Sequence, residues 1–222
     1  MRGLFVTGTD TGVGKSVVAA AICAALVARG EPVTAFKPAV TGLEQAPGEW
    51  PMDHDLLAAA AGGGQAAEQV APYRYAPPLS PHYAAELAGE TIDPARLLAV
   101  ARSAADRFLV AEGVGGLMVP ITTGYLVRDL AVDLGLRIVV AARTGLGTIN
   151  HTLLTVEAAR GAGLRVAGVV MTPWPREPEP IEQSNRETVE GLSGVAVSGL
   201  PPTSPGNLAE AAEALPLDDW LR

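Results

Sequence analysis

The chain contains only two lysines, Lys15 and Lys37, among 16 Lys and Arg residues in 222 positions. Lys15 lies near the end of the glycine-rich segment 8–16, GTDTGVGKS, and Lys37 follows the next apolar run of the sequence. A lysine ammonium is a compact charge on a thin stem and fits inside a ring of backbone amides, whereas a guanidinium is a wide planar fork. The two lysines therefore predict phosphate chemistry, with a nucleotide site at Lys15 and a substrate site beside it.

The glycine-rich segment has the pattern of a phosphate-binding loop. An apolar strand over residues 3–7 is predicted to precede it and a helix over 16–29 to follow it. Successive amides and the start of a helix favour an anion, Lys15 would reach the terminal phosphates, and the Ser16 hydroxyl would bind Mg²⁺. Five residues rather than four separate Gly8 from Gly14. The expected nucleotide contacts in this loop are Asp10, Gly12, Val13, Gly14, Lys15, Ser16 and Val17.

Carboxylates that could complete a magnesium site occur in two places. Glu112 directly follows a predicted strand over 108–111, where an unpaired buried carboxylate would cost free energy. Asp53 and Asp55 open a helix predicted over 55–61, and either of them has an equally good explanation as a helix N-cap. Glu112 is therefore the stronger candidate, and it is also expected to face the nucleotide.

Short apolar runs alternate with helical segments along the whole chain. This alternation predicts a single α/β domain over residues 1–222, of the P-loop NTPase type, with a mostly parallel sheet covered by helices on both faces. Ligands in such sheets bind beyond the carboxyl ends of the strands. We expect strands over 33–36, 108–111, 137–142, 166–171 and 195–198, helices over 94–105, 127–134, 149–161 and 181–192, and irregular proline-rich segments over 72–81 and 173–180. Of the three tryptophans, only Trp174 is expected at the ligand edge.

The net charge and the composition exclude some classes of binding partner. A formal net charge of −8 argues against nucleic acid as a main partner. The single cysteine, Cys23, lies in an apolar helical segment and is expected to be an inert buried thiol. We find no signal-peptide pattern and no apolar run long enough to span a membrane, so we expect a cytoplasmic protein without a membrane partner.

Taken together, these motifs resemble the dethiobiotin synthetase family, and the match runs nearly from end to end. The phosphate loop is similar to that of the family, including its longer spacing. The other similar segments recur in family order: Lys37-Pro38-Ala39-Val40-Thr41-Gly42, Ser80-Pro81-His82, Glu112-Gly113-Val114-Gly115-Gly116, Gly147-Thr148-Ile149-Asn150-His151 and Gly199-Leu200-Pro201.

The resemblance implies an ATP- and Mg²⁺-dependent ligase of biotin biosynthesis. In this family CO₂ adds to one amine of 7,8-diaminononanoate to give a carbamate, ATP phosphorylates the carbamate, and the second amine closes the cyclic urea as phosphate leaves. By resemblance, Lys15 and Lys37 stabilise the charge that shifts during transfer, and Thr11 and Thr41 hydrogen-bond the diamine or the carbamate. The magnesium ligands implied are Ser16, Asp55 and Glu112, with Asp55 aligning better than Asp53.

The resemblance also implies a homodimer in which the substrate carboxylate docks at a helix start on the opposite subunit. The residues expected there are Gly145, Leu146, Gly147, Thr148 and Asn150, although Thr148 could instead simply cap the helix. The base of the nucleotide is expected near Thr172, Pro173 and Pro202. The family often has an asparagine after the fifth strand that reads the base, where this chain has Thr172-Pro173-Trp174. The absence of the amide predicts that ATP is accepted together with other nucleoside triphosphates.

The main alternative is a nucleotide-switch ATPase of the partitioning or metal-insertase type, which shares the predicted fold. Such proteins usually carry an additional lysine early in the phosphate loop, where this chain has Thr9-Asp10-Thr11. A GTPase is less favoured because the sequence has no Asn-Lys-x-Asp motif. A non-enzymatic binding module would leave Lys37 and the carboxylates without a joint purpose. Phosphate release that requires the diamine would separate the synthetase from a switch ATPase.

Overall fold

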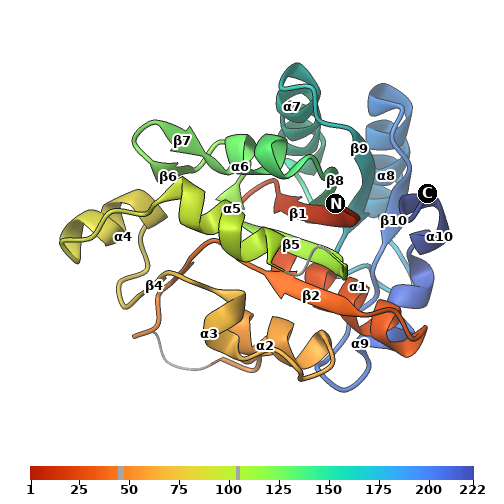
Figure 1. Ribbon diagram of the computed structural model, residues 1–222. Helices are drawn as coiled ribbons and strands as arrows, with labels where there is room; N and C mark the ends of the chain where they lie inside the picture. Colours follow the sequence, from red (N-terminus) through yellow and green to blue (C-terminus); the bar gives the residue numbers. More distant parts are fainter. Residues whose placement is uncertain (45–47, 104–105) are drawn as a thin grey trace.

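The computed structural model describes residues 1–44, 48–103 and 106–222, and its centre is a six-stranded parallel sheet (Figure 1). The strand order is β10-β9-β8-β1-β5-β2, and each neighbouring pair is parallel. The strands are β1 (Gly3–Gly8), β2 (Val33–Phe36), β5 (Phe108–Gly116), β8 (Arg137–Ala142), β9 (Val166–Met171) and β10 (Val197–Gly199). The predicted α/β class with a parallel sheet is confirmed.

Helices cover both faces of this sheet, as the alternation of elements predicts. The principal helices are α1 (Lys15–Ala28), α2 (Asp53–Ala60), α5 (Pro94–Arg102), α6 (Val127–Leu134), α7 (Thr148–Gly161) and α8 (Pro180–Ser193). The shorter ones are α3 (Ala67–Val70), α4 (Pro81–Leu87), α9 (Leu208–Ala211), the 3₁₀ turn η1 (Ala212–Ala214) and α10 (Leu217–Trp220).

Alternate residues of each strand belong to two separate cores. In β1, Leu4 and Val6 pack with α1, α2, α9 and α10, whereas Phe5 belongs to the core beneath α5, α6, α7 and α8. Successive side chains of a strand point to opposite faces, so a strand buried on both faces must be apolar throughout. This explains why the central strands are unbroken apolar runs, and it leaves little room for polar side chains except at the strand ends.

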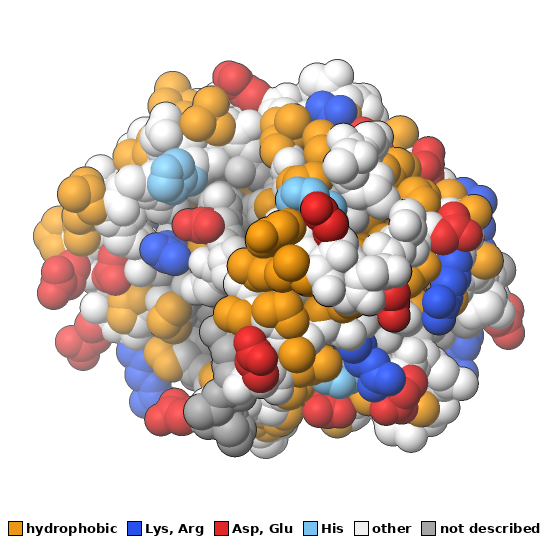
Figure 2. Space-filling view, turned by 90° about the vertical axis from the view of Figure 1, so that its left-hand side faces the viewer, with side chains coloured by type: hydrophobic (Ala, Val, Ile, Leu, Met, Phe, Trp, Pro, Cys, Tyr) orange, Lys and Arg blue, Asp and Glu red, His pale blue; other side chains and the backbone are white. Residues whose placement is uncertain are grey.

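Additional small elements gather at the carboxyl ends of the strands. Two short ladders lie there, β3 (Val40–Thr41) with β4 (Arg74–Tyr75), and β6 (Pro120–Thr122) with β7 (Tyr125–Leu126). This edge lies on the left of Figure 1 and faces the viewer in Figure 2, where acidic and basic side chains lie close together beside a band of hydrophobic ones. Of these strands, β3 contributes Thr41 to the wall of the first cavity described below.

Most predicted element bounds agree with the structure to within two residues, and three predictions need correction. β5 continues past Ala111 to Gly116, so Glu112 lies inside a strand rather than after one. α2 begins at Asp53 rather than at Asp55. The proline-rich segment 72–81 was expected to be irregular, but it holds β4 and the first residue of α4. The predicted helix 94–105 is α5, and its last two predicted residues lie outside the described ranges.

Local features explain two helix ends. Asp93 caps α5, where its Oδ1 accepts a hydrogen bond from the amide of Ala95 at 2.9 Å. Gly14, with φ of +84°, turns the phosphate loop into α1, and a Cβ there would lie 2.5 Å from the side chain of Thr172. No helix in the described part of the chain is long and apolar enough to cross a membrane.

A test of the packing concerns Gly168 in β9, which lies against the buried Trp220 of α10. A Cβ at Gly168 would come within 2.7 Å of the Trp220 ring. We expect Gly168→Ala to lower the free energy of unfolding by about 1–3 kcal/mol, because the ring or the strand must shift. Urea unfolding would measure the change.

Gly191 of α8 provides the control, because a Cβ there would meet nothing within 4 Å. Gly191→Ala should stabilise the protein by about 0.5–1 kcal/mol, through helix propensity. A Gly168→Ala variant as stable as the wild type would contradict the packing of α10 on the sheet.

Candidate active site

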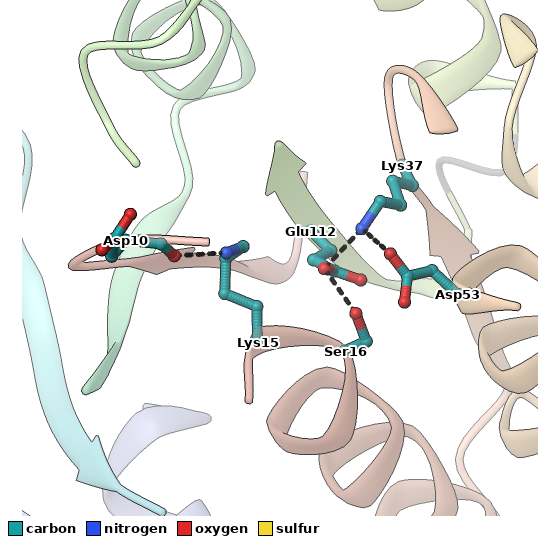
Figure 3. A network of polar contacts seen from close by, with 6 residues as sticks. All are labelled: Asp10, Lys15, Ser16, Lys37, Asp53 and Glu112. Atoms are coloured by element: carbon teal, nitrogen blue, oxygen red, sulfur yellow. Dashed lines mark hydrogen bonds and ion pairs between the residues drawn. The ribbon is translucent and has the colours of Figure 1, made fainter. Parts of the chain in front are cut away.

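A buried carboxylate, Glu112, is the centre of the predicted site. Glu112 is 0 % exposed. Its Oε1 accepts hydrogen bonds from Lys37 Nζ at 2.6 Å and from Ser16 Oγ at 2.9 Å. Lys37 Nζ also donates to Asp53 Oδ2 at 2.6 Å (Figure 3). Four segments therefore meet at one polar cluster: the first turn of α1, the end of β2, the start of α2 and β5.

The topology explains this meeting. β1 and β2 both pair with β5 in parallel, so the carboxyl ends of these three strands are adjacent. The phosphate loop follows β1, Lys37 follows β2, and Glu112 lies in β5. α1 starts directly after the phosphate loop, which places Ser16 in its first turn facing Glu112. Ser16, Lys37 and Glu112 are thus held in place by α1, β2 and β5, whose other residues are mostly apolar and buried in the core.

The charges in the cluster shift one another's pKa values. Burial lowers the pKa of Lys37, but the carboxylates of Glu112 and Asp53 outweigh it, so the pKa is raised and the ammonium stays charged. Burial alone would raise the pKa of Asp53, and Lys37 reverses this effect and lowers it. Burial dominates at Glu112 and raises its pKa. Burial likewise lowers the pKa of Lys15.

The second oxygen of Glu112, Oε2, is buried and has no hydrogen-bond partner among the described residues. An unpaired buried carboxylate oxygen costs free energy, and a hard cation such as Mg²⁺ takes oxygen ligands of this kind. Ser16, Glu112 and Asp53 therefore fit a magnesium ion by their chemistry and position. The described residues hold no group of three or more His, Cys, Asp and Glu side chains suited to a metal.

Asp55 was predicted to be the helical carboxylate of the metal site, and the structure corrects this prediction. Asp55 is exposed and does not line the cavity at the cluster, whereas Asp53 lines it and contacts Lys37. Both residues lie on α2, and positions two apart point about 200° away from each other around a helix. Once Asp53 faces Lys37, Asp55 must face solvent.

Lys15 belongs to the phosphate loop itself and lines the same cavity as Lys37. It is buried, a Cβ at Gly8 would lie 2.9 Å from its side chain, and its Nζ donates to the Asp10 carbonyl at 2.7 Å (Figure 3). Arg143, which follows β8, donates to the Thr11 carbonyl at 3.2 Å and so ties the loop to the segment before α7. Arg143 was not predicted, although its place directly after a core strand was a signal for it.

Two cavities adjoin the phosphate loop. The first, of about 710 Å³, is lined by both lysines and the carboxylates, and also by Thr11, Thr41, Ser80 and Pro81. The second, of about 590 Å³, is lined by Gly12, Val13, Gly14 and Val17 and by the predicted base-binding residues Thr172, Pro173 and Pro202. Asp10 lines neither cavity with its side chain, and its carbonyl holds Lys15 instead.

The predicted carboxylate-binding segment is only partly joined to these cavities. Gly145 lines the second cavity, whereas Leu146, Gly147, Thr148 and Asn150 line neither. Gly147, with φ of +87°, precedes the first residue of α7. Thr148 is buried and donates its hydroxyl to the Arg143 carbonyl at 2.6 Å, which is a structural role within the chain. Asn150 is exposed on the first turn of α7.

The tryptophans are placed differently from the prediction. Trp174 lines neither cavity, because its ring lies against Gly199 and under the guanidinium of Arg186. Trp50 lines both cavities. The signal for Trp50 was its place between Lys37 and Asp53, in a crossover that must pass over the carboxyl edge. Cys23 is buried as predicted, and burial raises the pKa of its thiol.

The fold is shared with P-loop proteins of low sequence identity. The chain superimposes on apo McdA from Cyanthece with a TM-score of 0.51 at 10 % identity, covering 95 % of this chain and 90 % of that one. It matches chloroplast FtsY from Physcomitrella patens with a TM-score of 0.50 at 13 % identity, covering 95 % and 64 %. Similarity at this level shows the P-loop NTPase fold alone.

Sequence similarity is much closer to one group of proteins. Residues 2–206 match the family described as an AAA domain. The ATP-dependent dethiobiotin synthetase BioD of Anaeromyxobacter dehalogenans (strain 2CP-C) is 44 % identical over 217 residues, which cover 97 % of this chain and 96 % of that protein. The BioD proteins of Rhodococcus erythropolis (strain PR4 / NBRC 100887) and Bacillus subtilis (strain 168) are 39 % and 36 % identical, each covering 91 % of this chain and 88 % and 87 % of theirs. The chain therefore belongs to the dethiobiotin synthetase family.

Proposed function

We propose that this chain is an ATP- and Mg²⁺-dependent ligase that closes the ureido ring of dethiobiotin from 7,8-diaminononanoate and CO₂. The observation that carries this proposal is that both lysines line one cavity together with Ser16, Asp53 and Glu112. A phosphate loop with one lysine would serve any nucleotide hydrolase. A second buried lysine opposite the loop serves a second anion, and the carbamate of a carboxylated diamine is such an anion.

The roles follow from position and charge. Lys15 would turn from the Asp10 carbonyl to the terminal phosphates, and Lys37 would contact the carbamate oxygens and the phosphoryl group in transfer. Fixed cations in a site that excludes water lower the barrier as charge moves between oxygens. Thr11 and Thr41 line the same cavity and would donate to, or accept from, the diamine and the carbamate.

Ser16, Glu112 and Asp53 would hold the magnesium ion, which when bound neutralises charge on the nucleotide phosphates. Glu112 gives the strongest support for this assignment, because its Oε2 is buried without a hydrogen-bond partner in the described residues. Ser16 Oγ and Lys37 Nζ both donate hydrogen bonds to the other carboxylate oxygen of Glu112, Oε1. The carboxylate is therefore already oriented before a cation arrives.

We also propose that the working unit is a homodimer in which α7 of one subunit completes the site of the other. Support comes from large apolar side chains that are exposed near α7: Leu146 is 93 % exposed, Leu154 56 % and Met118 52 %. Leu154 and Met118 line the same hollow of about 200 Å³, next to the end of β5. A second copy of the chain would cover this surface.

The first prediction separates catalysis from nucleotide binding. Lys37→Ala should retain nucleotide binding but lose diamine-dependent phosphate release by about 10²-fold or more, because a charge that stabilises the transferred group is removed. Lys37→Arg should also fail, since a guanidinium is too wide for this site. Lys15→Ala serves as a comparison and should lose both properties, as judged by calorimetry and phosphate assays. Near-normal turnover of Lys37→Ala would refute the role of Lys37.

The second prediction concerns the two aspartates of α2. Asp53→Asn should raise the Mg²⁺ concentration needed for half-maximal turnover by about tenfold or more, because one carboxylate of the metal site is lost. Asp55→Asn removes the same charge two residues away, on the exposed side of the helix, and should behave like the wild type. Equal effects of the two variants would mean that net charge rather than ligation is responsible.

The third prediction tests the shared site by mixing two inactive proteins, Lys37→Ala and Asn150→Ala. After subunit exchange, about half of the dimers contain one of each chain, and one of their two sites is intact if the site is shared. Activity should then return to about one quarter of that of the wild type. Exchange would be monitored with differently tagged chains. Proven exchange without recovered activity would place both ends of the substrate within one chain.

A further inference from the structure

Trp50 lines both cavities but has no role in the function proposed above. It lies between β3 and α2, it is half buried, and like Val17 it packs against the core that contains α1. It lines the cavity that holds the lysines and also the second cavity beside Thr172. In the described chain, the other residues common to both cavities are Gly12, Gly14 and Val17, which all belong to the phosphate loop and the first turn of α1.

A nucleotide bound here must cross the boundary between the two cavities. Its phosphates are directed to the amides of the phosphate loop and to Lys15, whereas its base is directed to the space beside Thr172 and Pro202. The ribose and the near edge of the base then lie at the boundary. Val17 forms one side of this boundary and Trp50 contributes the aromatic surface.

The second cavity offers few groups that could distinguish one base from another. Its walls include Pro173, Pro201 and Pro202, and its polar side chains are the hydroxyls of Thr144, Thr172 and Thr203 together with Arg143. No Asn, Gln, Asp or Glu side chain lines it among the described residues. A base in such a cavity gains more from apolar contact and stacking than from a bidentate amide pair.

We infer that Trp50 is the stacking surface for the nucleoside part of the nucleotide, and that it supplies binding energy common to all bases. This inference rests on the proposed nucleotide-dependent function and adds to it the residue that holds the nucleoside. Every base presents a π face, so stacking on an aromatic ring tolerates a change of base, whereas hydrogen-bond recognition does not. Stacking on Trp50 would let a cavity with few base-specific groups hold any nucleotide.

The test measures binding of ATP, CTP, GTP and inorganic triphosphate, each with Mg²⁺ and without diamine, by calorimetry. Trp50→Leu should weaken the three nucleotides by about tenfold each and leave inorganic triphosphate unchanged, because only the nucleotides carry a group to stack. Trp50→Phe keeps an aromatic ring and should stay within about threefold of the wild type. Trp174→Phe is the matched control, since Trp174 lines neither cavity, and it should bind all four ligands normally.

Three results would overturn the inference. Nucleotide affinities of Trp50→Leu within about twofold of the wild type would show that the ring does not contact the nucleoside. An equal loss for inorganic triphosphate would show that Trp50 only shapes the phosphate loop. A loss confined to one base would show recognition of that base rather than general stacking.

Fluorescence gives a second readout that does not depend on how well Trp50→Leu folds. Nucleotides, but not inorganic triphosphate, should change the tryptophan emission of the wild type, and this change should disappear in Trp50→Phe and persist in Trp174→Phe. A change that persists in Trp50→Phe would contradict the contact. Wild-type protein that binds nucleotide but releases no phosphate with diamine would refute the proposed ligase function alone, and the Trp50 comparison would still be decided.

Discussion

The burial of one carboxylate, Glu112, is the constraint on which the site depends. A charge at 0 % exposure inside a parallel sheet is costly unless it is paired, and Lys37 at 2.6 Å provides the pairing. This requirement fixes the end of β2 relative to β5, and Ser16 on the same oxygen fixes the start of α1. The second oxygen of Glu112, Oε2, has no hydrogen-bond partner in the described residues, and an oxygen of this kind suits a cation.

The surrounding fold makes this arrangement stable by being apolar elsewhere. Alternate residues of β1 enter two different cores, and the helices on each face seal them. Polar groups are therefore confined to the carboxyl edge, where strands end and the backbone turns. The same geometry collects loops from β1, β2, β5, β8 and β9 around two adjoining cavities, and only the first of them is lined by the lysines and the carboxylates.

The two cavities also differ in the chemistry of the side chains that line them. The first contains two ammonium groups and two carboxylates, so small movements of charge there have large energetic effects. The second consists mainly of prolines, glycines and threonines, which offer shape rather than charge.

The sequence alone determined the order of strands and helices and the phosphate loop, and it singled out Lys15, Lys37 and Glu112, which line one cavity. These features depend on local periodicity and on residue types that are rare in apolar surroundings. The sequence favoured Asp55 over Asp53 and Trp174 over Trp50, whereas Asp53 and Trp50 are the residues that line the cavities. Each choice depends on which side of a helix or loop faces the cavity, and that is set by contacts with distant segments. Lys37 selects Asp53, and the close approach of Gly199 removes Trp174 from the site, so only the tertiary structure could make both assignments.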